Sequence, residues 1–259
     1  MLREYLSTLA NAFRSKLGTT EKINAQDYPN KIDEVYEAGY NKGKSEGGGD
    51  SYDDVFWDNY QDNGDRTDCM GMFMGTGWNN NTLKPKHSIS PKNASYMFCK
   101  CSYSGDLNEL FDGENLTLDF SNCTAFNYTF WNANNITRLG TIDASKVTAS
   151  DGLDSIFNCA KLKIVDSFVP PKIPVKAVCF YTASNNIMER FIVSGSITKD
   201  FNLSRCSKLD DDSVQSAIDH LVDLTGGTTQ TLTFAANIGN RLTQEQKDQI
   251  TAKNWTLAY

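Results

Sequence analysis

Apolar residues recur at helical spacing near the start of the chain. Their steps are four, three, four and four residues, and Gly18 follows them as a stop signal. The pattern predicts an amphipathic helix with one apolar face, formed by Leu2, Leu6, Leu9, Phe13 and Leu17. A weaker stripe at Ile32, Val35 and Tyr36 predicts a second helix.

Two short helices bury too little apolar surface to be stable alone, so the first face needs a partner. We expect it to drive self-association, with a trimer favoured; the alternative is that the helices fold back on the rest of the chain. Three glycines at 47–49 have too many backbone states for the interior of an element. The predicted organisation is an assembly or attachment segment (1–46), a Gly-rich linker (47–50) and one domain (51–259).

The long C-terminal part contains an approximate repeat of an aromatic, a small and an aliphatic residue. Copies occupy 120–126, 130–136 and 203–209, and the steps from Phe157 to Phe180 and from Phe180 to Leu203 are both 23 residues. Strand-like stretches follow several copies: ITRLGTID, LKIVDSFV and MERFIVSG. Such a period is typical of leucine-rich repeats, whose units stack to close one core. The rival interpretation is a compact α+β domain whose similar pieces arise by chance.

The end of the chain is predicted to cap this domain. Three aspartates at 210–212 precede an apolar helical face, TLTFAANI from Thr231 is typical of a strand, and Thr243 with Gln246 forms a capping-box pattern. Trp255 opens a last predicted strand and is expected to seal the core. The predicted fold class is α+β: an N-terminal helical segment, then an irregular leucine-rich-repeat, β-solenoid-like domain with a helix and strand cap.

Composition narrows the functions. A net charge of −7 and a pI of about 4.9 disfavour nucleic-acid binding, because phosphates require a basic surface. No apolar run is long enough for a spanning helix and no signal peptide precedes the chain, so we expect synthesis in the cytoplasm and no membrane insertion. Seven cysteines without a CxxC pair, beside two histidines, indicate buried thiols and neither a metal nor a cofactor.

Two parts of the sequence resemble known proteins. From Asp58 to the end, with GWNNNTLKPKHSI, NASYMF, LTLDFSNCTAFNYTF and ITRLGTID, the chain resembles BspA-like leucine-rich repeat proteins encoded by phages and prophages of gut bacteria. The stretch LANAFRSKLGTTEKINAQDYPNKIDEVYEAGYNKGK resembles the N-terminal module of phage tail or tail-fibre proteins. The resemblance implies a repeat domain that recognises a ligand or cell surface, and a module that attaches it to other virion proteins.

The predicted function is therefore a virion-associated structural protein of the tail-fibre or receptor-binding type, located on the tail or a surface appendage, which binds a bacterial surface glycan or protein. Aromatic rings can stack on sugar faces, and the candidate ligand-binding residues are Trp57, Trp78 and Trp131. The alternatives are a purely structural or decoration protein and, with less support, a tail-borne glycan hydrolase. We expect no enzymatic activity, because no nucleophile, phosphate or zinc motif is present.

Overall fold

The computed structural model describes residues 69–73, 88–101, 103–112, 116–180 and 187–259. The chain divides into two compact units, Met1–Asp62 and Asn63–Tyr259, and all described residues belong to the second. The predicted linker, the two predicted N-terminal helices and the five assembly residues from Leu2 to Leu17 lie outside the described residues.

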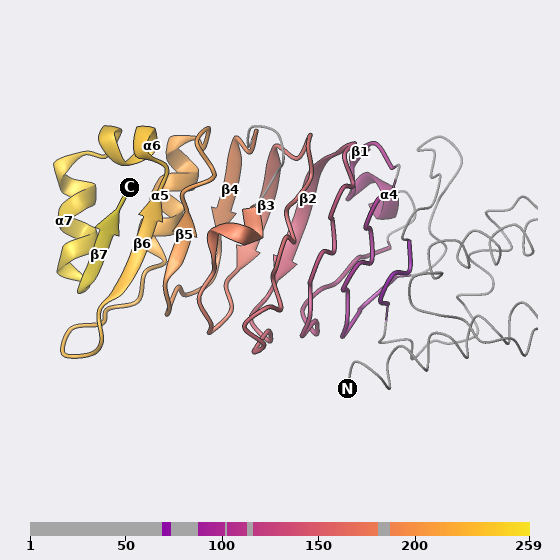
Figure 1. Ribbon diagram of the computed structural model, residues 1–259, viewed down its shortest axis with the longest axis horizontal. Helices are drawn as coiled ribbons and strands as arrows, with labels where there is room; N and C mark the ends of the chain where they lie inside the picture. The colour runs from indigo at the N-terminus through magenta and orange to yellow at the C-terminus, as the bar shows by residue number, and fades with distance from the viewer. Residues whose placement is uncertain (1–68, 74–87, 102, 113–115, 181–186) are drawn as a thin grey trace, which may run out of the picture. The chain divides into compact units, whose positions relative to one another are not determined.

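The described strands form two parallel sheets (Figure 1). The first has the order β1-β2-β3-β4, with β1 at Gly105–Asp106, β2 at Ile136–Asp143, β3 at Ile164–Val169 and β4 at Arg190–Val193. The second has the order β5-β6-β7, with β5 at Phe201–Leu203, β6 at Gln230–Phe234 and β7 at Trp255–Ala258. Parallel neighbours need a crossover between them, and here each connection passes through turns or helices.

The helices of the described part are few and short. They are α4 at Glu109–Asp112, the 3₁₀ helix η2 at Ala177–Phe180, α5 at Asp211–Asp219, α6 at Ala236–Arg241 and α7 at Gln244–Ala252. Helix α5 connects β5 to β6, and α6 and α7 connect β6 to β7. The second sheet therefore has the strand–helix–strand connectivity of an α/β protein.

The prediction of an irregular leucine-rich-repeat, β-solenoid-like domain is wrong. The strands divide into a four-stranded and a three-stranded parallel sheet with few helices, which is an α/β-like arrangement. The sequence repeat misled the prediction because its copies are not equivalent in space. Phe120 and Phe130 head two copies, yet Phe120 packs on Phe126 while Phe130 stacks on Phe98.

The strands themselves were located well by their composition. ITRLGTID is β2, and the cores of LKIVDSFV and MERFIVSG are β3 and β4. Burial along β2 recurs every third residue, at Ile136, Leu139 and Ile142, instead of alternating. The predicted strand from Thr231 ends at Phe234, where the chain turns at Ala235 into α6.

Phenylalanine rings fill the core and connect successive segments of the chain. Phe157 lies centrally: its ring centroid is 5.3 Å from that of Phe180, 5.6 Å from that of Phe191 and 5.8 Å from that of Phe168. All four side chains are at most 2% exposed. Ring contacts of this kind add to the free energy gained by burying apolar area.

The predicted capping box at Thr243 and the predicted burial of Trp255 are confirmed. The Thr243 hydroxyl accepts a hydrogen bond from the Gln246 backbone, and the Gln246 side chain accepts one from the Thr243 backbone, which completes the capping box of α7. Trp255 is 3% exposed, and its indole N–H donates to the Val222 carbonyl at 2.8 Å. This tryptophan therefore seals the core, as the sequence predicts.

Asp210 caps α5 and ties it to the first sheet. Its carboxylate accepts hydrogen bonds from the backbone and the hydroxyl of Ser213 and from Arg190. Burial raises the pKa of Asp210, but the bonds from Ser213 and Arg190 outweigh that effect and hold this pKa below its ordinary value. The carboxylate therefore contributes stability above about pH 4, the ordinary range of an Asp pKa, and this contribution is lost as pH falls through the lowered pKa.

Replacing Asp210 with asparagine tests this contribution. Asparagine is also a good N-cap, so the substitution removes mainly the charge. We expect Asp210→Asn to lower the free energy of unfolding by about 1 kcal/mol at pH 6, because the pair with Arg190 is partly exposed. The deficit should shrink at pH 3, towards which the wild-type carboxylate loses its advantage as pH falls through the lowered pKa. Urea unfolding at both pH values measures it, and an equal deficit at both would contradict the assignment.

Candidate functional site

The three tryptophans proposed from the sequence have different outcomes. Trp57 and Trp78 lie outside the described residues. Trp131 is described and is half-buried in the turns that lead into β2. Trp131 is therefore the one predicted ligand-binding residue that lies in the described part of the chain.

Tyr128 and Lys100 contact Trp131, and Tyr96 extends the cluster by stacking on Tyr128. Its ring makes an edge contact with Tyr128, with centroids 6.1 Å apart and planes at 82°. Tyr128 in turn stacks on Tyr96, with centroids 5.1 Å apart and planes at 17°. The ammonium of Lys100 lies 5.4 Å from the centroid of the Trp131 ring, which is cation–π distance. We call Tyr96, Tyr128 and Trp131 the aromatic platform.

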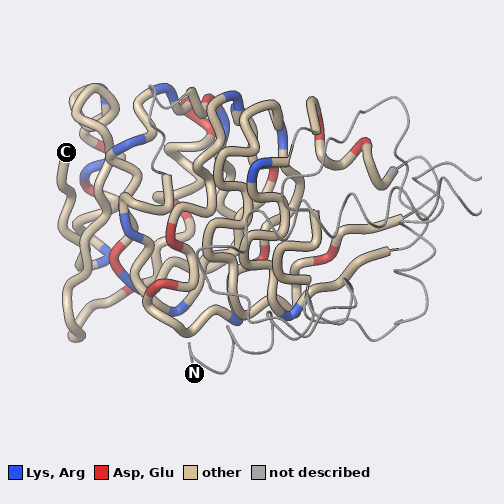
Figure 2. The backbone as a smooth tube through the Cα atoms, turned by 45° about the vertical axis from the view of Figure 1, so that its right-hand side comes forward, with Lys and Arg blue, Asp and Glu red and all other residues tan. Residues whose placement is uncertain are grey.

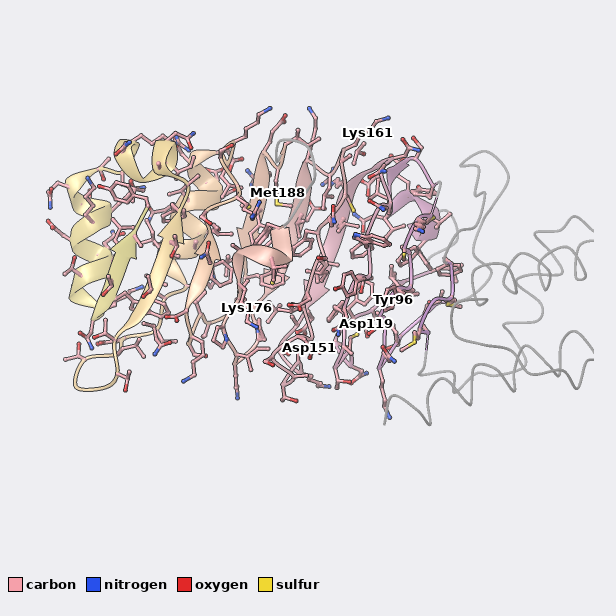
Figure 3. The ribbon with its side chains drawn as sticks, in the orientation of Figure 1. Tyr96, Asp119, Asp151, Lys161, Lys176 and Met188 are labelled. Atoms are coloured by element: carbon pink, nitrogen blue, oxygen red, sulfur yellow. The ribbon has the colours of Figure 1, made fainter. Side chains whose placement is uncertain are left out.

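The platform lies at the surface. Tyr96 is 36% exposed, while Tyr128 and Trp131 are half-buried. Figure 3 labels Tyr96 on the part of the unit nearest β1, at a distance from the C-terminal helices. The phenylalanines two residues after the tyrosines, Phe98 and Phe130, are fully buried and stack on each other at 5.4 Å. Each tyrosine of the stacked surface pair thus shares its turn with one phenylalanine of the buried pair.

Backbone hydrogen bonds place these tyrosines in one column. The N–H of Gly71 donates to Ser95, that of Tyr96 to Asn127 and that of Tyr128 to Asp154, at 2.8–3.0 Å. Each column residue therefore bonds to the residue just before the next one. The column is Gly71, Tyr96, Tyr128 and Ser155, and each member lies two residues before a buried phenylalanine.

All four column residues have a left-handed backbone. Their φ angles are 65° at Gly71, 58° at Tyr96, 58° at Tyr128 and 53° at Ser155. Glycine adopts this conformation freely, whereas a side chain with a Cβ costs about 1–2 kcal/mol there. Bulky tyrosines are therefore unusual at these positions. Strain of this kind clusters at functional sites, so the two tyrosines indicate one.

One polar atom near the platform lacks a partner. The side-chain oxygen of Asn127, the residue before Tyr128, is buried and accepts no hydrogen bond in the part of the chain that the structure describes. Such an atom carries a desolvation penalty of about 1–3 kcal/mol. Burial, and then the neighbouring Tyr128, raises the pKa of Tyr96 above its ordinary value of 10, so its hydroxyl is neutral and can donate at neutral pH.

The carboxylates with arginine partners do not resemble an acid–base pair. Arg138 on β2 bonds Asp166 on β3 at 2.9 Å and lies 3.6 Å from Asp106 on β1, while Arg190 bonds Asp210 at 2.9 Å. Glycoside hydrolysis needs one protonated carboxyl group, whereas at Asp210 the effect of burial is outweighed by the hydrogen bonds from Ser213 and Arg190, which lower its pKa and favour its ionised form. Figure 2 shows basic and acidic positions interspersed along the described unit.

All seven cysteines are buried thiols, which confirms their predicted burial. Burial raises the pKa of Cys99 and Cys123 to about 11 and that of Cys179 to about 12. No group of three or more potential metal ligands occurs among the described residues.

We expect no thiol of the native protein to react with Ellman's reagent at pH 8, because the reactive thiolate is both scarce and covered. Seven equivalents should react once denaturant is added. Absorbance at fixed times measures both. Fast reaction of one native thiol would show that a cysteine is accessible.

Trp131 was predicted from the sequence as a site residue, whereas Tyr96, Tyr128 and Lys100 were not. A signal was present: Tyr96–Phe98 and Tyr128–Phe130 both have the pattern Tyr-x-Phe. The left-handed backbone that presents these tyrosines has no sequence marker, because only glycine or asparagine usually announces it.

Comparisons with protein-family models, curated proteins and solved structures found no match to this chain. None of the described helices has the length and apolar character needed to cross a membrane. The aromatic platform and the sequence resemblance are therefore the two observations that bear on the function.

Proposed function

We propose that the protein is a virion-associated structural protein of a bacteriophage or prophage, of the tail-fibre or receptor-binding type, and that it binds a host-surface glycan through the aromatic platform. The observation that carries the proposal is the pair of tyrosines, Tyr96 and Tyr128, stacked at the surface on left-handed backbone beside Trp131. The left-handed backbone recurs at Gly71 and Ser155 of the same column, so the placing of tyrosines at two of these positions, and not the backbone itself, favours a ligand over the structural alternative, a particle protein without an external ligand.

The chemistry of the platform suits a saccharide. Aromatic rings offer apolar faces that can pack against the C–H faces of a sugar, and tyrosine hydroxyls supply hydrogen bonds at the edge. Binding sites of this kind combine aromatic contacts with a few fixed polar groups.

The virion part of the proposal is supported by the sequence resemblance. In this account, residues 1–46 assemble the chain into a homo-oligomer, with a trimer favoured, and attach it to other virion proteins. The protein is made in the host cytoplasm and then carried on the tail or a surface appendage. The platform would be repeated once per protomer, and repeated weak sites raise the overall avidity for a cell surface.

Binding of the labelled full-length chain to a panel of gut bacteria tests the proposal. We expect binding that is lost when cells are oxidised with periodate, which destroys sugars, and kept when surface proteins are digested. Trp131→Ala should abolish it, and Trp131→Phe, which keeps a ring, should retain most of it.

Four results would contradict the proposal in different ways. Binding lost only on protease treatment would point to a protein receptor. Binding that Trp131→Ala leaves unchanged would show that the platform is not the binding site. No binding to any cell would favour the structural alternative. Release of glycan fragments from the cells would favour the hydrolase.

A further inference from the structure

Lys100 has three properties that the stacking of sugars does not explain. It is exposed, its ammonium lies over the Trp131 ring, and its backbone is left-handed, with φ at 55°. The residue at the equivalent place in the next turn is Asn132, with φ at 56°. Asparagine tolerates this conformation well, whereas a lysine there is strained.

Lys100 also has no carboxylate partner among the described residues. In contrast, Arg138, Lys163, Arg190 and Arg241 each pair with a carboxylate. What distinguishes Lys100 from other lysines of the described ranges is its place, because its ammonium lies over the Trp131 ring at the edge of the platform in a chain with a net charge of −7.

We infer that the platform binds an anionic saccharide, with the sugar ring on the aromatic side chains and its carboxylate or phosphate on Lys100. This inference rests on the proposed function and narrows its ligand. A ring contact and a charge contact from one ligand fix its orientation, which neither does alone. An ammonium serves either anion, because it acts as a point charge and does not require the planar geometry that arginine recognises.

Pairs of glycans that differ only in charge test how much the anionic group contributes to binding, apart from the sugar ring. The full-length chain is titrated with oligogalacturonate and with its methyl ester, which has the same sugar backbone without the charge. Two further arms use a phosphate-bearing teichoic acid, and uronate-containing capsular polysaccharides before and after carboxyl reduction. We expect the charged member of at least one pair to bind about tenfold more tightly at low salt, with the preference falling as salt rises.

Lys100→Asn is the diagnostic variant, because asparagine already occupies the equivalent position in the next turn. It should remove the preference for the charged glycan and leave the affinity for the neutral one unchanged. A matched control is Lys92→Asn, which removes one positive charge at another exposed position on the preceding stretch of chain and should leave the preference intact.

The outcomes separate this inference from the proposed function. Equal binding of charged and neutral members, lost in Trp131→Ala, overturns the anionic inference and leaves glycan binding standing. A preference for charged glycans that Lys100→Asn does not change overturns the role of Lys100. Binding to none of these glycans, charged or neutral, overturns the inference, and the cell-binding assay then decides the proposed function separately.

Discussion

Replacing Phe157 with alanine is expected to lower the free energy of unfolding of the described unit by about 4 kcal/mol. Phe157 is 2% exposed and contacts Phe168, Phe180 and Phe191 within 6 Å between ring centroids. Alanine removes these ring contacts and leaves a cavity that three large side chains cannot fill without leaving their own positions. Urea unfolding followed by circular dichroism measures the loss.

Phe157→Leu is the matched control for this prediction. It keeps most of the buried volume, so its cost should be well below that of alanine. Tyr259→Ala is a second control at an exposed position, since Tyr259 is 52% exposed, and it should change the stability little. A cost below about 1 kcal/mol for Phe157→Ala would show that these rings do not form the core we describe.

Replacing Tyr128 with glycine is expected to separate stability from binding. Glycine adopts the left-handed backbone without strain and already occupies the equivalent position at Gly71. Relief of this strain should raise the free energy of unfolding by up to about 1 kcal/mol. The loss of the ring contacts with Tyr96 and Trp131 offsets part of that gain. We therefore expect thermal stability close to that of the wild type, and binding to cells or glycan at least tenfold weaker.

Ser155→Gly is the matched control for the strain. Ser155 belongs to the same column, with φ at 53°, but carries no ring. It should show a similar relief of strain with unchanged binding. If Tyr128→Gly instead unfolds the protein, the tyrosines have a structural role; if it binds like the wild type, the platform is not the binding site. A trade of stability for function is common where a site holds strained residues.

Local elements could be predicted from the sequence where a side chain has one clear physical role. The helix cap at Thr243 and Gln246, the strand ITRLGTID and the burial of Trp255 all follow from local patterns. The division into two sheets did not follow, because it depends on which distant strands pair. Phe98 stacks on Phe130 across 32 positions, and Phe157 on Phe180 across 23, so no single period describes the chain.

The candidate site was predictable only in part. Tryptophan is a conspicuous ligand-binding candidate, and Trp131 was found for that reason. Tyr96 and Lys100 join Tyr128 and Trp131 because turns far apart in sequence align through backbone hydrogen bonds such as Tyr96 to Asn127. Their left-handed conformation is imposed by this alignment and is not announced by the residues themselves.

Calorimetry with a purified surface glycan tests whether the aromatic platform is the binding site. The full-length wild type, Tyr128→Gly and Ser155→Gly are titrated by calorimetry with surface polysaccharide purified from a bacterium that the wild type binds. The account predicts equal affinity for the wild type and Ser155→Gly and at least a tenfold loss for Tyr128→Gly, with all three folded. Equal affinity for all three proteins would contradict it.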